Sequence, residues 1–275
     1  MRKFIDRVLR YIGKYFHGPT QYVPVTVPVL QSDLLKGRRA LITGGSSGIG
    51  LAIAKSYLDN GASVVITGRD ATKLSIAQKS LASSGLVETL VLDNASPESF
   101  DDSVASIGDF DILVNNAGYV GGDGFGSTKI SEYNKVLDTN LRGAYFLSQV
   151  VSNMWIKNGI RGNILNICSA SSLRPGESPY ILSKWGLRSL TIGMARKLIK
   201  HGIVVNGLAP GCTDTRRFCP HPEESISNPR NPTGRLVTVE EIGNMAVVMV
   251  SSLARMVVGD VVYATGGGAI TTLDD

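Results

Sequence analysis

Tyr180 and Lys184 are the pair of side chains in this sequence best suited to proton transfer. They stand four residues apart in the segment Tyr180-Ile181-Leu182-Ser183-Lys184, so on a helix both project from one face. Reducing a ketone requires a proton donor beside the developing alkoxide, and oxidising an alcohol requires a base. A phenol can serve in both directions when a neighbouring cation favours its phenolate form. Taken alone, such a pair is also compatible with an ordinary surface position.

A serine hydroxyl is available close to the end of a predicted strand. Ser169 follows the predicted strand at residues 163–167, where its hydroxyl could hydrogen-bond a substrate oxygen and act as a small oxyanion site. Ser171 and Ser172 lie close by in the sequence. The register therefore stays open between these hydroxyls.

A glycine-rich segment joins the first predicted strand to a helix. It reads T-G-G-S-S-G-I-G from Thr43 to Gly50, with the spacing T-G-x-x-x-G-x-G. Glycines let the backbone approach a pyrophosphate, and a helix N-terminus offers free N–H donors and a favourable dipole. By itself the segment is also compatible with a simple tight turn. The residues expected to contact a dinucleotide here are Gly44, Ser46, Ser47, Gly48, Ile49 and Gly50.

The second predicted strand ends in Thr67-Gly68-Arg69, without an Asp or Glu. In a doubly wound fold an acidic side chain at this place commonly binds a ribose 2′-hydroxyl. An acid there would repel a 2′-phosphate, whereas the guanidinium of Arg69 can pair with it through charge-assisted hydrogen bonds. In isolation a solvated arginine would be the favoured interpretation, but this context favours NADP(H) over NAD(H).

Asn115-Asn116-Ala117-Gly118 follows the fourth predicted strand. Small residues and side-chain amides at such a place can line a cofactor groove and also tie neighbouring strands together. The sequence does not separate these two roles.

The elements that must position these residues alternate between short apolar strands and helices. Continuous apolar strands separated by helices indicate a parallel sheet covered on both faces, which is a doubly wound α/β fold. Its ligands should gather at the carboxyl ends of the strands. The predicted strands are residues 40–43, 63–67, 89–92, 111–115, 163–167, 203–207 and 260–264, with early helices at residues 49–60 and 71–83.

Length and composition predict one catalytic domain, residues 34–275, after an N-terminal extension, residues 1–33. The chain has 275 residues, of which 43% are hydrophobic, and its three cysteines are too scattered for a disulfide framework. No apolar run of about 18 residues and no secretory signal pattern occurs. These features favour a reducing, cytoplasmic location. The body carries no basic stretch interleaved with aromatics, so nucleic acid is not an expected ligand.

Much of the formal charge of +5 lies in the first sixteen residues. There, apolar side chains fall on one face of a predicted amphipathic helix, and residues 22–30 form an extended, proline-containing arm. Three roles remain open for this extension: packing on the oligomer, peripheral membrane contact through residues 1–16, or organellar targeting.

Taken together, the motifs from about Leu35 to Gly268 resemble the classical short-chain dehydrogenase/reductase family in their order and spacing. The matching segments are Thr43–Gly50, Asn115–Gly118, Asp138-Thr139-Asn140-Leu141, Ile167-Cys168-Ser169, Y-I-L-S-K at Tyr180–Lys184, Pro210-Gly211 and Gly266-Gly267. The resemblance implies a single Rossmann-type domain. It also implies an oxidoreductase that acts on a small-molecule carbonyl or alcohol.

The resemblance further implies a catalytic tetrad. Tyr180 is then the acid/base, and Lys184 supports it and holds the nicotinamide ribose. Ser169 orients the substrate, and Asn140 anchors a proton-relay water. The remaining residues implied to contact the cofactor are Asp93, Asn94, Asn116, Ala117, Gly118, Pro210, Gly211, Thr213 and Thr215. No metal is expected.

Two departures from the family pattern matter. The stretch from Ser169 to Tyr180 is slightly short, which keeps Ser171 as a possible substitute. Ser47 stands where many NADP-using relatives carry a basic residue, so Arg69 has to provide most of the phosphate recognition.

The resulting prediction is an NADP(H)-dependent reductase of a 3-oxoacyl thioester or a comparable ketone. The alternative is a nicotinamide-binding scaffold or sensor with weak or lost catalysis. A homodimer or homotetramer is expected, with helices around residues 136–155 and 180–201 at a shared face. The polar segment at residues 215–235 would suit an anionic substrate, although its charges could equally face water.

Overall fold

The computed structural model describes residues 33–215, 226–228 and 231–268. The predicted N-terminal helix and arm lie outside the described residues, as does much of the polar segment at residues 215–235. Within the described part of the chain, no helix combines the length and the hydropathy needed to cross a bilayer.

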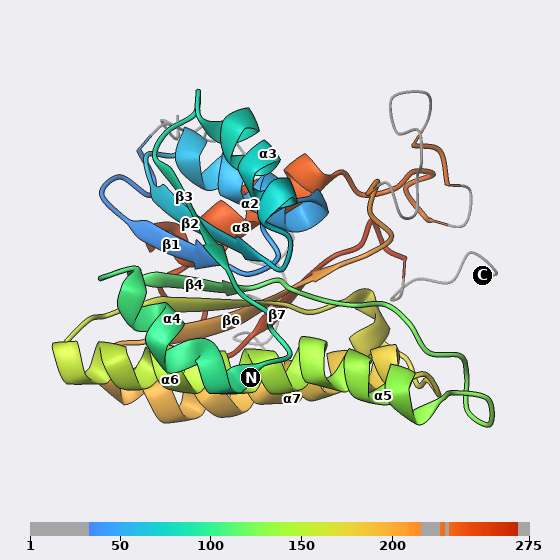
Figure 1. The fold of residues 1–275 in the computed structure, drawn as a ribbon. Coiled ribbons are helices and arrows are strands. Elements are labelled where there is room, and N and C mark those ends of the chain that lie inside the picture. Colours follow the sequence, from blue (N-terminus) through green and yellow to red (C-terminus); the bar gives the residue numbers. More distant parts are fainter. Residues whose placement is uncertain (1–32, 216–225, 229–230, 269–275) are drawn as a thin grey trace, which may run out of the picture. The chain divides into compact units, whose positions relative to one another are not determined.

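Seven strands form one parallel sheet in the described residues, in the spatial order β3-β2-β1-β4-β5-β6-β7 (Figure 1). The strands are β1 (Arg39–Ile42), β2 (Ser63–Gly68), β3 (Val87–Val91), β4 (Ile112–Asn115), β5 (Asn163–Ile167), β6 (Val204–Pro210) and β7 (Val261–Ala264). The order reverses at β1, whose Leu41 pairs with Val65 of β2 on one side and with Leu113 of β4 on the other. The predicted doubly wound parallel sheet is therefore confirmed.

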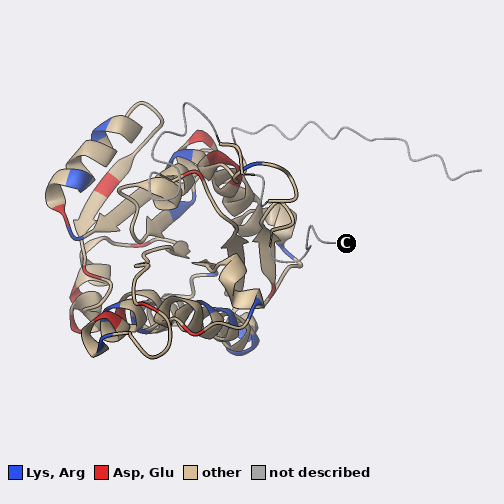
Figure 2. Cartoon of the chain, turned by 90° about the vertical axis from the view of Figure 1, so that its right-hand side faces the viewer, with Lys and Arg blue, Asp and Glu red and all other residues tan. Residues whose placement is uncertain are grey.

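Helices cover both faces of the sheet (Figure 1). One face is covered by α2 (Gly48–Asp59), α3 (Ala71–Leu81) and α8 (Val239–Val250), and the other by α4 (Phe100–Ser106), α5 (Ile130–Leu137), α6 (Gly143–Asn158) and α7 (Pro179–Leu198). Short turns complete the chain: η1 (Pro97–Ser99), η2 (Asp138–Arg142), η3 (Ala170–Leu173), η4 (Ile199–His201) and η5 (Ser252–Ala254). Figure 2 looks toward the carboxyl ends of the strands, with the helical layers above and below.

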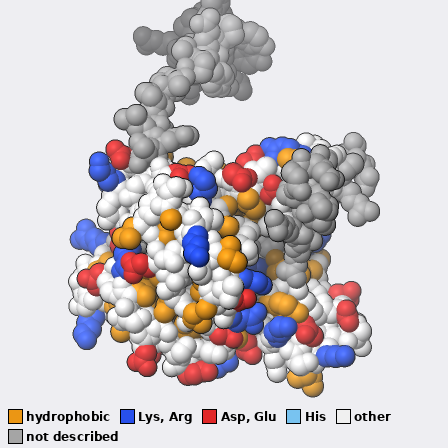
Figure 3. All heavy atoms as spheres, turned by 45° about the horizontal axis from the view of Figure 1, so that its top comes forward, with side chains coloured by type: hydrophobic (Ala, Val, Ile, Leu, Met, Phe, Trp, Pro, Cys, Tyr) orange, Lys and Arg blue, Asp and Glu red, His pale blue; other side chains and the backbone are white. Residues whose placement is uncertain are grey.

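Each face of the sheet has its own hydrophobic core because successive strand residues point to opposite sides. Ile42 packs with Tyr57 of α2 and Val250 of α8, whereas its neighbour Leu41 packs with Trp155 of α6. All five side chains are buried. On the outer surface of the layer with α2, α3 and α8, cationic, acidic and single apolar side chains are interspersed (Figure 3).

The element bounds differ from the predicted ones by a few residues, and one predicted helix is interrupted. The helix predicted around residues 136–155 consists of α5, the π-helical turn η2 and α6. Gly143 begins α6 directly against the backbone of Asn94, where an added Cβ would lie 2.0 Å from the Asn94 carbonyl oxygen. This close approach brings η2, which contains Asn140, to the carboxyl end of β3.

The N-terminus of α8 is closed by a capping box and an ion pair. Thr238 and Glu241 bond to each other's backbone N–H groups, and Arg235 donates two hydrogen bonds to the Glu241 carboxylate, at 2.7 and 2.9 Å. The hydrogen bonds from Arg235 and the Thr238 backbone N–H hold the pKa of Glu241 at about 2, below its usual value of 4.5.

We expect the stability of the Glu241→Gln variant to fall less with decreasing pH than that of the wild type. Because the pKa of Glu241 is lowered by folding, its contribution is fully present above pH 4.5 and is lost as the pH falls to about 2. Solvent screens this half-exposed pair, so the effect should be small but measurable. Thermal unfolding midpoints across this window should fall more steeply in the wild type than in the variant. Glu240→Gln is the matched control, and equal slopes in wild type and Glu241→Gln would contradict the assignment.

Candidate active site

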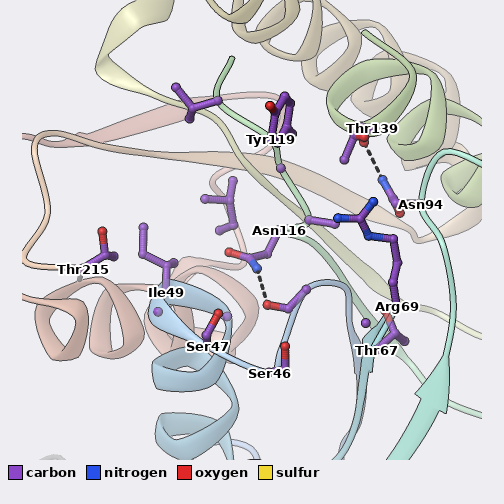
Figure 4. A pocket seen from close by; sticks show the side chains of 18 of the residues that line it. Ser46, Ser47, Ile49, Thr67, Arg69, Asn94, Asn116, Tyr119, Thr139 and Thr215 are labelled. Atoms are coloured by element: carbon purple, nitrogen blue, oxygen red, sulfur yellow. Dashed lines mark hydrogen bonds between the residues drawn. The ribbon is translucent and has the colours of Figure 1, made fainter. Parts of the chain in front are cut away.

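A pocket of about 730 Å³ lies at the carboxyl ends of the strands. Such a volume is typical of small-molecule and cofactor sites, which span roughly 300–1,000 Å³. The glycine-rich loop, the ends of several strands and the first turns of α7 bound it. Figure 4 shows the part of the lining around the glycine-rich loop and Arg69. Every site residue predicted from the sequence lines this pocket, with the exception of Asn140.

The glycine-rich loop forms one wall of the pocket and depends on the absence of side chains. Gly44 and Gly48 adopt φ values of 64° and 54°, in the left-handed region that favours glycine. A Cβ on Gly50 would lie 2.4 Å from the Gly44 carbonyl oxygen and from Nδ2 of Asn116. Helix α2 begins at Gly48, and the side chain of Ser47 does not cap it. Its first N–H groups thus remain as donors for an anion.

Asn116 and Thr43 hold this loop against the end of β4. Nδ2 of Asn116 donates to the carbonyl oxygens of Thr43, at 2.8 Å, and Gly44, at 3.1 Å (Figure 4). The hydroxyl oxygen of Thr43 accepts hydrogen bonds from the N–H groups of Asn116 and Ala117. The Asn116 side chain is therefore used to tie the loop, while Ala117 and Gly118 line the pocket directly.

The end of β2 supplies positive charge to the pocket. Arg69 extends into it (Figure 4), and Lys73, one turn along α3, also lines it. Asp70 caps α3 by accepting from the N–H groups of Thr72 and Lys73, and its carboxylate lies 4.0 Å from Nζ of Lys73. Lys73 is not among the residues predicted from the sequence, and it reaches the pocket from the first turn of α3.

The third strand brings Asp93 and Asn94 to the same pocket. Nδ2 of Asn94 donates to the carbonyl oxygen of Thr139 at 2.6 Å, which joins the end of β3 to the π-helical turn (Figure 4). On the far side, Thr215 comes close to the glycine-rich loop, because a Cβ on Gly48 would lie 3.4 Å from its Cγ2. The loop after β6 therefore closes toward the loop after β1.

Helix α7 carries Tyr180 and Lys184 into the pocket. It begins at Pro179, and the hydroxyl of Ser178 accepts from the N–H of Ile181 at the N-cap. The Lys184 side chain is buried, its Nζ donates to the carbonyl oxygen of Ile167 at 2.8 Å, and it lies 5.8 Å from the centroid of the Tyr180 ring. The predicted juxtaposition of a phenol and an ammonium is therefore present in the structure.

Of the three serines near the end of β5, Ser169 lines the pocket and the other two do not. Its hydroxyl oxygen accepts from the N–H of Ser171 at 3.1 Å and caps the short turn η3. The Ser172 hydroxyl donates to the Ser169 carbonyl oxygen and lies 3.2 Å from the Tyr263 hydroxyl. Ser171 and Ser172 are buried beside the pocket.

Asn140 is buried behind the pocket wall. Its Oδ1 accepts from the N–H of Tyr119 at 2.7 Å, and its Nδ2 donates to the Tyr119 carbonyl oxygen and the Ser183 hydroxyl. Both amide hydrogens are thereby used. The side-chain amide of Asn140 therefore has no hydrogen left for the relay water expected from the family resemblance. Such a water would have to donate a hydrogen bond to an oxygen atom of Asn140.

Several pocket-lining residues were not identified from the sequence. Most adjoin a motif, but Lys135 comes from α5, where its Nζ lies 4.1 Å from the centroid of the Tyr119 ring. The additional lining residues are Thr67, Gly68, Asp70, Lys73, Leu92, Tyr119, Val120, Lys135, Thr139, Ile167 and Cys168. Burial raises the pKa of the Cys168 thiol to about 11, although Lys184 acts to lower it, so this thiol is neutral at neutral pH.

The described residues contain no group of three or more His, Cys, Asp or Glu side chains arranged to hold a metal ion. Much of the segment at residues 215–235, with its arginines and histidine, lies outside the described residues. The suggestion of an anionic substrate based on that segment therefore stays a prediction.

The sequence is similar to known proteins along most of its length. The profile of the short chain dehydrogenase family matches residues 38–224. The chain is 38% identical over 244 residues to gluconate 5-dehydrogenase of Gluconobacter oxydans (strain 621H), covering 85% of this chain and 95% of that protein. It is 33% identical over 238 residues to the 3-oxoacyl-(acyl-carrier-protein) reductase of Escherichia coli (strain K12), covering 84% and 97% respectively.

Solved structures agree with these relatives. A gluconate 5-dehydrogenase from Burkholderia cenocepacia J2315, in complex with NADP and tartrate, superposes with a TM-score of 0.80 at 31% identity, covering 88% of this chain and 99% of that one. An actinorhodin polyketide ketoreductase variant with NADPH gives a TM-score of 0.78 at 28% identity, covering 85% and 98%. The predicted resemblance is confirmed, and this chain belongs to the short-chain dehydrogenase/reductase family of oxidoreductases.

Proposed function

We propose that this protein is an NADP(H)-dependent oxidoreductase that interconverts a carbonyl group and a secondary alcohol. One observation carries the proposal. A phenol, a buried ammonium and a hydroxyl, from Tyr180, Lys184 and Ser169, line one part of a pocket that also holds the glycine-rich loop and Arg69.

The shape and charge of the pocket fit a dinucleotide phosphate. The loop at Gly44 and Gly50 leaves no space for side chains, and the N-terminus of α2 offers N–H donors beside it. Arg69 and Lys73 supply two cations at the end of β2. When bound, NADP(H) would donate or accept the hydride. The residues proposed to hold it are Gly44, Ser46, Ser47, Gly48, Ile49, Gly50, Arg69, Lys73, Asp93, Asn94, Asn116, Ala117, Gly118, Pro210, Gly211, Thr213 and Thr215.

The chain's own side chains handle the proton. In the reducing direction the Tyr180 hydroxyl donates a proton to the carbonyl oxygen, and in the oxidising direction its phenolate accepts the proton of the alcohol. The Lys184 ammonium favours that phenolate by its charge. The Ser169 hydroxyl donates a hydrogen bond to the same substrate oxygen and stabilises the charge that develops on it. Asn140 positions Tyr119 and α7 around these groups.

The preference for NADP(H) over NAD(H) rests on Arg69, with Lys73 in support. A 2′-phosphate carries roughly two negative charges, so a guanidinium can form strong charge-assisted hydrogen bonds with it. A ribose hydroxyl offers a much weaker partner. Ser47 supplies no positive charge, so Lys73 provides the second cation. The Asp70 carboxylate, 4.0 Å from Nζ of Lys73, partly offsets that charge.

We expect wild-type protein to use NADPH at least about tenfold better than NADH, as measured by kcat/KM, since hydrogen bonds to a charged group contribute about 1.5–3 kcal/mol. Gly68→Asp combined with Arg69→Ala should remove or reverse this preference. Lys73→Gln should reduce it by a few-fold, whereas Lys79→Gln, later in α3, is the matched control. A wild type that prefers NADH, or a double variant that keeps the NADPH preference, would overturn the role of Arg69.

The names of the relatives indicate which substrates to assay first. The two relatives described above are named for gluconate and for 3-oxoacyl-(acyl-carrier-protein) thioesters, and we would assay these with NADP and NADPH respectively. A wider panel of ketones and secondary alcohols should follow. Turnover with any member supports the proposed reaction. Complete inactivity of a protein that still binds NADPH would favour the alternative, a nicotinamide-binding scaffold or sensor.

We also propose a homodimer or homotetramer that uses the outer faces of α6 and α7. Large apolar side chains are exposed there, including Phe146, Trp185 and Ile192, the last of which is 50% exposed. Covering them in a subunit interface would be favourable. Light scattering at micromolar concentration should give a mass of two or four chains, and a monomer would contradict the proposal.

A further inference from the structure

Asn94 is a buried polar residue at the wall of the pocket, and only one end of its side-chain amide is used. Its Nδ2 donates to the Thr139 carbonyl oxygen at 2.6 Å (Figure 4). That carbonyl can only accept, so the oxygen end of the amide has to point elsewhere. The residue is 7% exposed, and its Oδ1 is buried with no hydrogen-bond partner among the described residues. Native proteins rarely leave a buried acceptor unpaired, so this atom requires an explanation.

Asn94 contacts the π-helical turn η2 near both of its ends. Thr139, which accepts the hydrogen bond, is the second residue of the turn, and Gly143 follows the last. A Cβ added to Gly143 would collide with both Nδ2 and the carbonyl oxygen of Asn94, so no space separates the two segments. A displacement of Asn94 would therefore displace the turn.

The turn connects Asn94 to the catalytic side of the pocket. Asn140 lies in the middle of the turn, and its amide bonds to the backbone of Tyr119 and to the Ser183 hydroxyl. The Ser183 hydroxyl donates to the carbonyl oxygen of Tyr180 at 2.7 Å. A short series of hydrogen bonds thus runs from Asn94 through the turn to the residue proposed as the acid/base.

At its other end this series reaches the part of the pocket proposed to hold the adenosine half of NADP(H). Asp93 and Asn94 line the pocket at the end of β3, and Arg69 lines it at the end of the neighbouring strand β2. The Arg69 guanidinium is proposed to select the 2′-phosphate, which is attached to the adenosine ribose. The residues at the end of β3 are therefore placed for the same half of the cofactor.

We propose that Asn94 is a positioning residue that couples occupancy of the adenosine site to the placement of Asn140 and Tyr180. The inference rests on the proposed use of NADP(H). An adenine packed against Asp93 and Asn94 would fix the Asn94 side chain, and its 6-amino group is a donor of the kind that the unpaired Oδ1 lacks. With Asn94 fixed, the turn and Asn140 would be held in one position. Binding energy from a part of the cofactor that does not react would thus orient the reacting groups.

Hydrogen exchange of the Tyr119 amide tests this coupling without a known substrate, because that N–H donates to Oδ1 of Asn140 at 2.7 Å. The probe is adenosine 2′,5′-bisphosphate, which corresponds to the adenosine half of NADP(H). In the wild type we expect the bisphosphate to slow this exchange at least about fivefold, the lower end of typical coupling between sites. In Asn94→Leu, which removes the hydrogen bond to Thr139 at similar side-chain volume, the change should be less than about twofold.

Kinetics supply a second readout with any substrate that is turned over. Asn94→Leu should lower kcat with NADPH at least about fivefold, whereas the Kd of the bisphosphate should change less than about threefold because Arg69 and Lys73 remain. A residue that only contacts adenine would show the reverse, weaker binding with unchanged kcat. Asn94→Ser, whose shorter side chain cannot reach the Thr139 carbonyl oxygen, should behave like Asn94→Leu and replaces it if leucine prevents folding.

Asn60→Leu is the matched control, because Asn60 resembles Asn94 in burial and hydrogen bonding. It is 8% exposed, its Nδ2 donates to the Ser56 carbonyl oxygen at 2.8 Å, and its Oδ1 is likewise buried without a described partner. It does not line the pocket. We expect Asn60→Leu to lower thermal stability but to keep the response of the Tyr119 amide to the bisphosphate.

The outcomes separate this inference from the cofactor proposal. If the bisphosphate binds the wild type without slowing Tyr119 exchange, or if Asn94→Leu keeps the full response, the coupling is wrong and the use of NADP(H) is unaffected. An equal loss of response in Asn60→Leu would also overturn the coupling, because it would identify general destabilisation as the cause. Failure of the bisphosphate to bind the wild type would overturn the cofactor proposal and this inference with it.

Discussion

Replacing Tyr180 with phenylalanine should lower kcat by about 10²- to 10⁴-fold, the range over which a positioned acid or base contributes to rate. The ring, its place at the start of α7 and its position near Lys184 are kept, so only the hydroxyl is lost. The walls of the pocket that would hold the dinucleotide phosphate are formed by other residues. NADPH should therefore bind with nearly unchanged Kd, measured by the change in its fluorescence.

Tyr263→Phe is the matched control for this experiment. Its hydroxyl also lies next to a serine of this region, 3.2 Å from that of Ser172, but it does not line the pocket. We expect it to turn over at close to the wild-type rate. Wild-type turnover by Tyr180→Phe would eliminate the phenol as the acid/base and direct attention to Ser169 or a water.

Lys184→Met should lower kcat by roughly 10²-fold and raise the KM for NADPH, because one ammonium favours the phenolate and also borders the place of the nicotinamide ribose. An added Cβ on Gly118 would lie 4.0 Å from Nζ, which puts the ammonium beside the wall formed by residues 116–118. If kcat falls while the KM for NADPH is unchanged, the second role of the ammonium is wrong.

Stability separates this catalytic effect from a folding defect. Lys184 is 5% exposed, so its charge is largely removed from water, and methionine has a similar shape without that charge. Methionine removes the desolvation cost of the buried ammonium but also removes the donor to the Ile167 carbonyl oxygen, and these two effects on stability have opposite signs. We therefore expect an unfolding midpoint close to that of the wild type. Lys197→Met, on the exposed side of α7, should change neither activity nor stability.

The fold was largely predictable because its signals are local. Strands such as β2, with Val64-Val65-Ile66 at its centre, are short apolar runs, and the helices between the strands carry periodic apolar residues. The parallel sheet with two covered faces therefore follows from sequence order. The ends of the helices and strands were predicted less accurately. The interruption between α5 and α6 depends on the approach of Gly143 to Asn94, a contact between segments far apart in the chain.

The candidate site shows the same division. The spacing of Tyr180 and Lys184, the glycines of the loop after β1 and the arginine at the end of β2 are each defined by a few consecutive residues. The sequence by itself was therefore sufficient to predict their common location at the carboxyl ends of the strands, while their chemistry stays a prediction.

Only the tertiary structure distinguished between residues whose local sequence is equivalent. Ser169 lines the pocket while Ser171 is buried beside it, a difference set by the turn η3 and by the packing of α7 against β5. Lys73 faces the pocket, and the amide of Asn140 bonds to Tyr119 and Ser183. The physical reason is that side-chain direction and hydrogen-bond partners depend on neighbours brought together by folding, which local patterns of residue type do not specify.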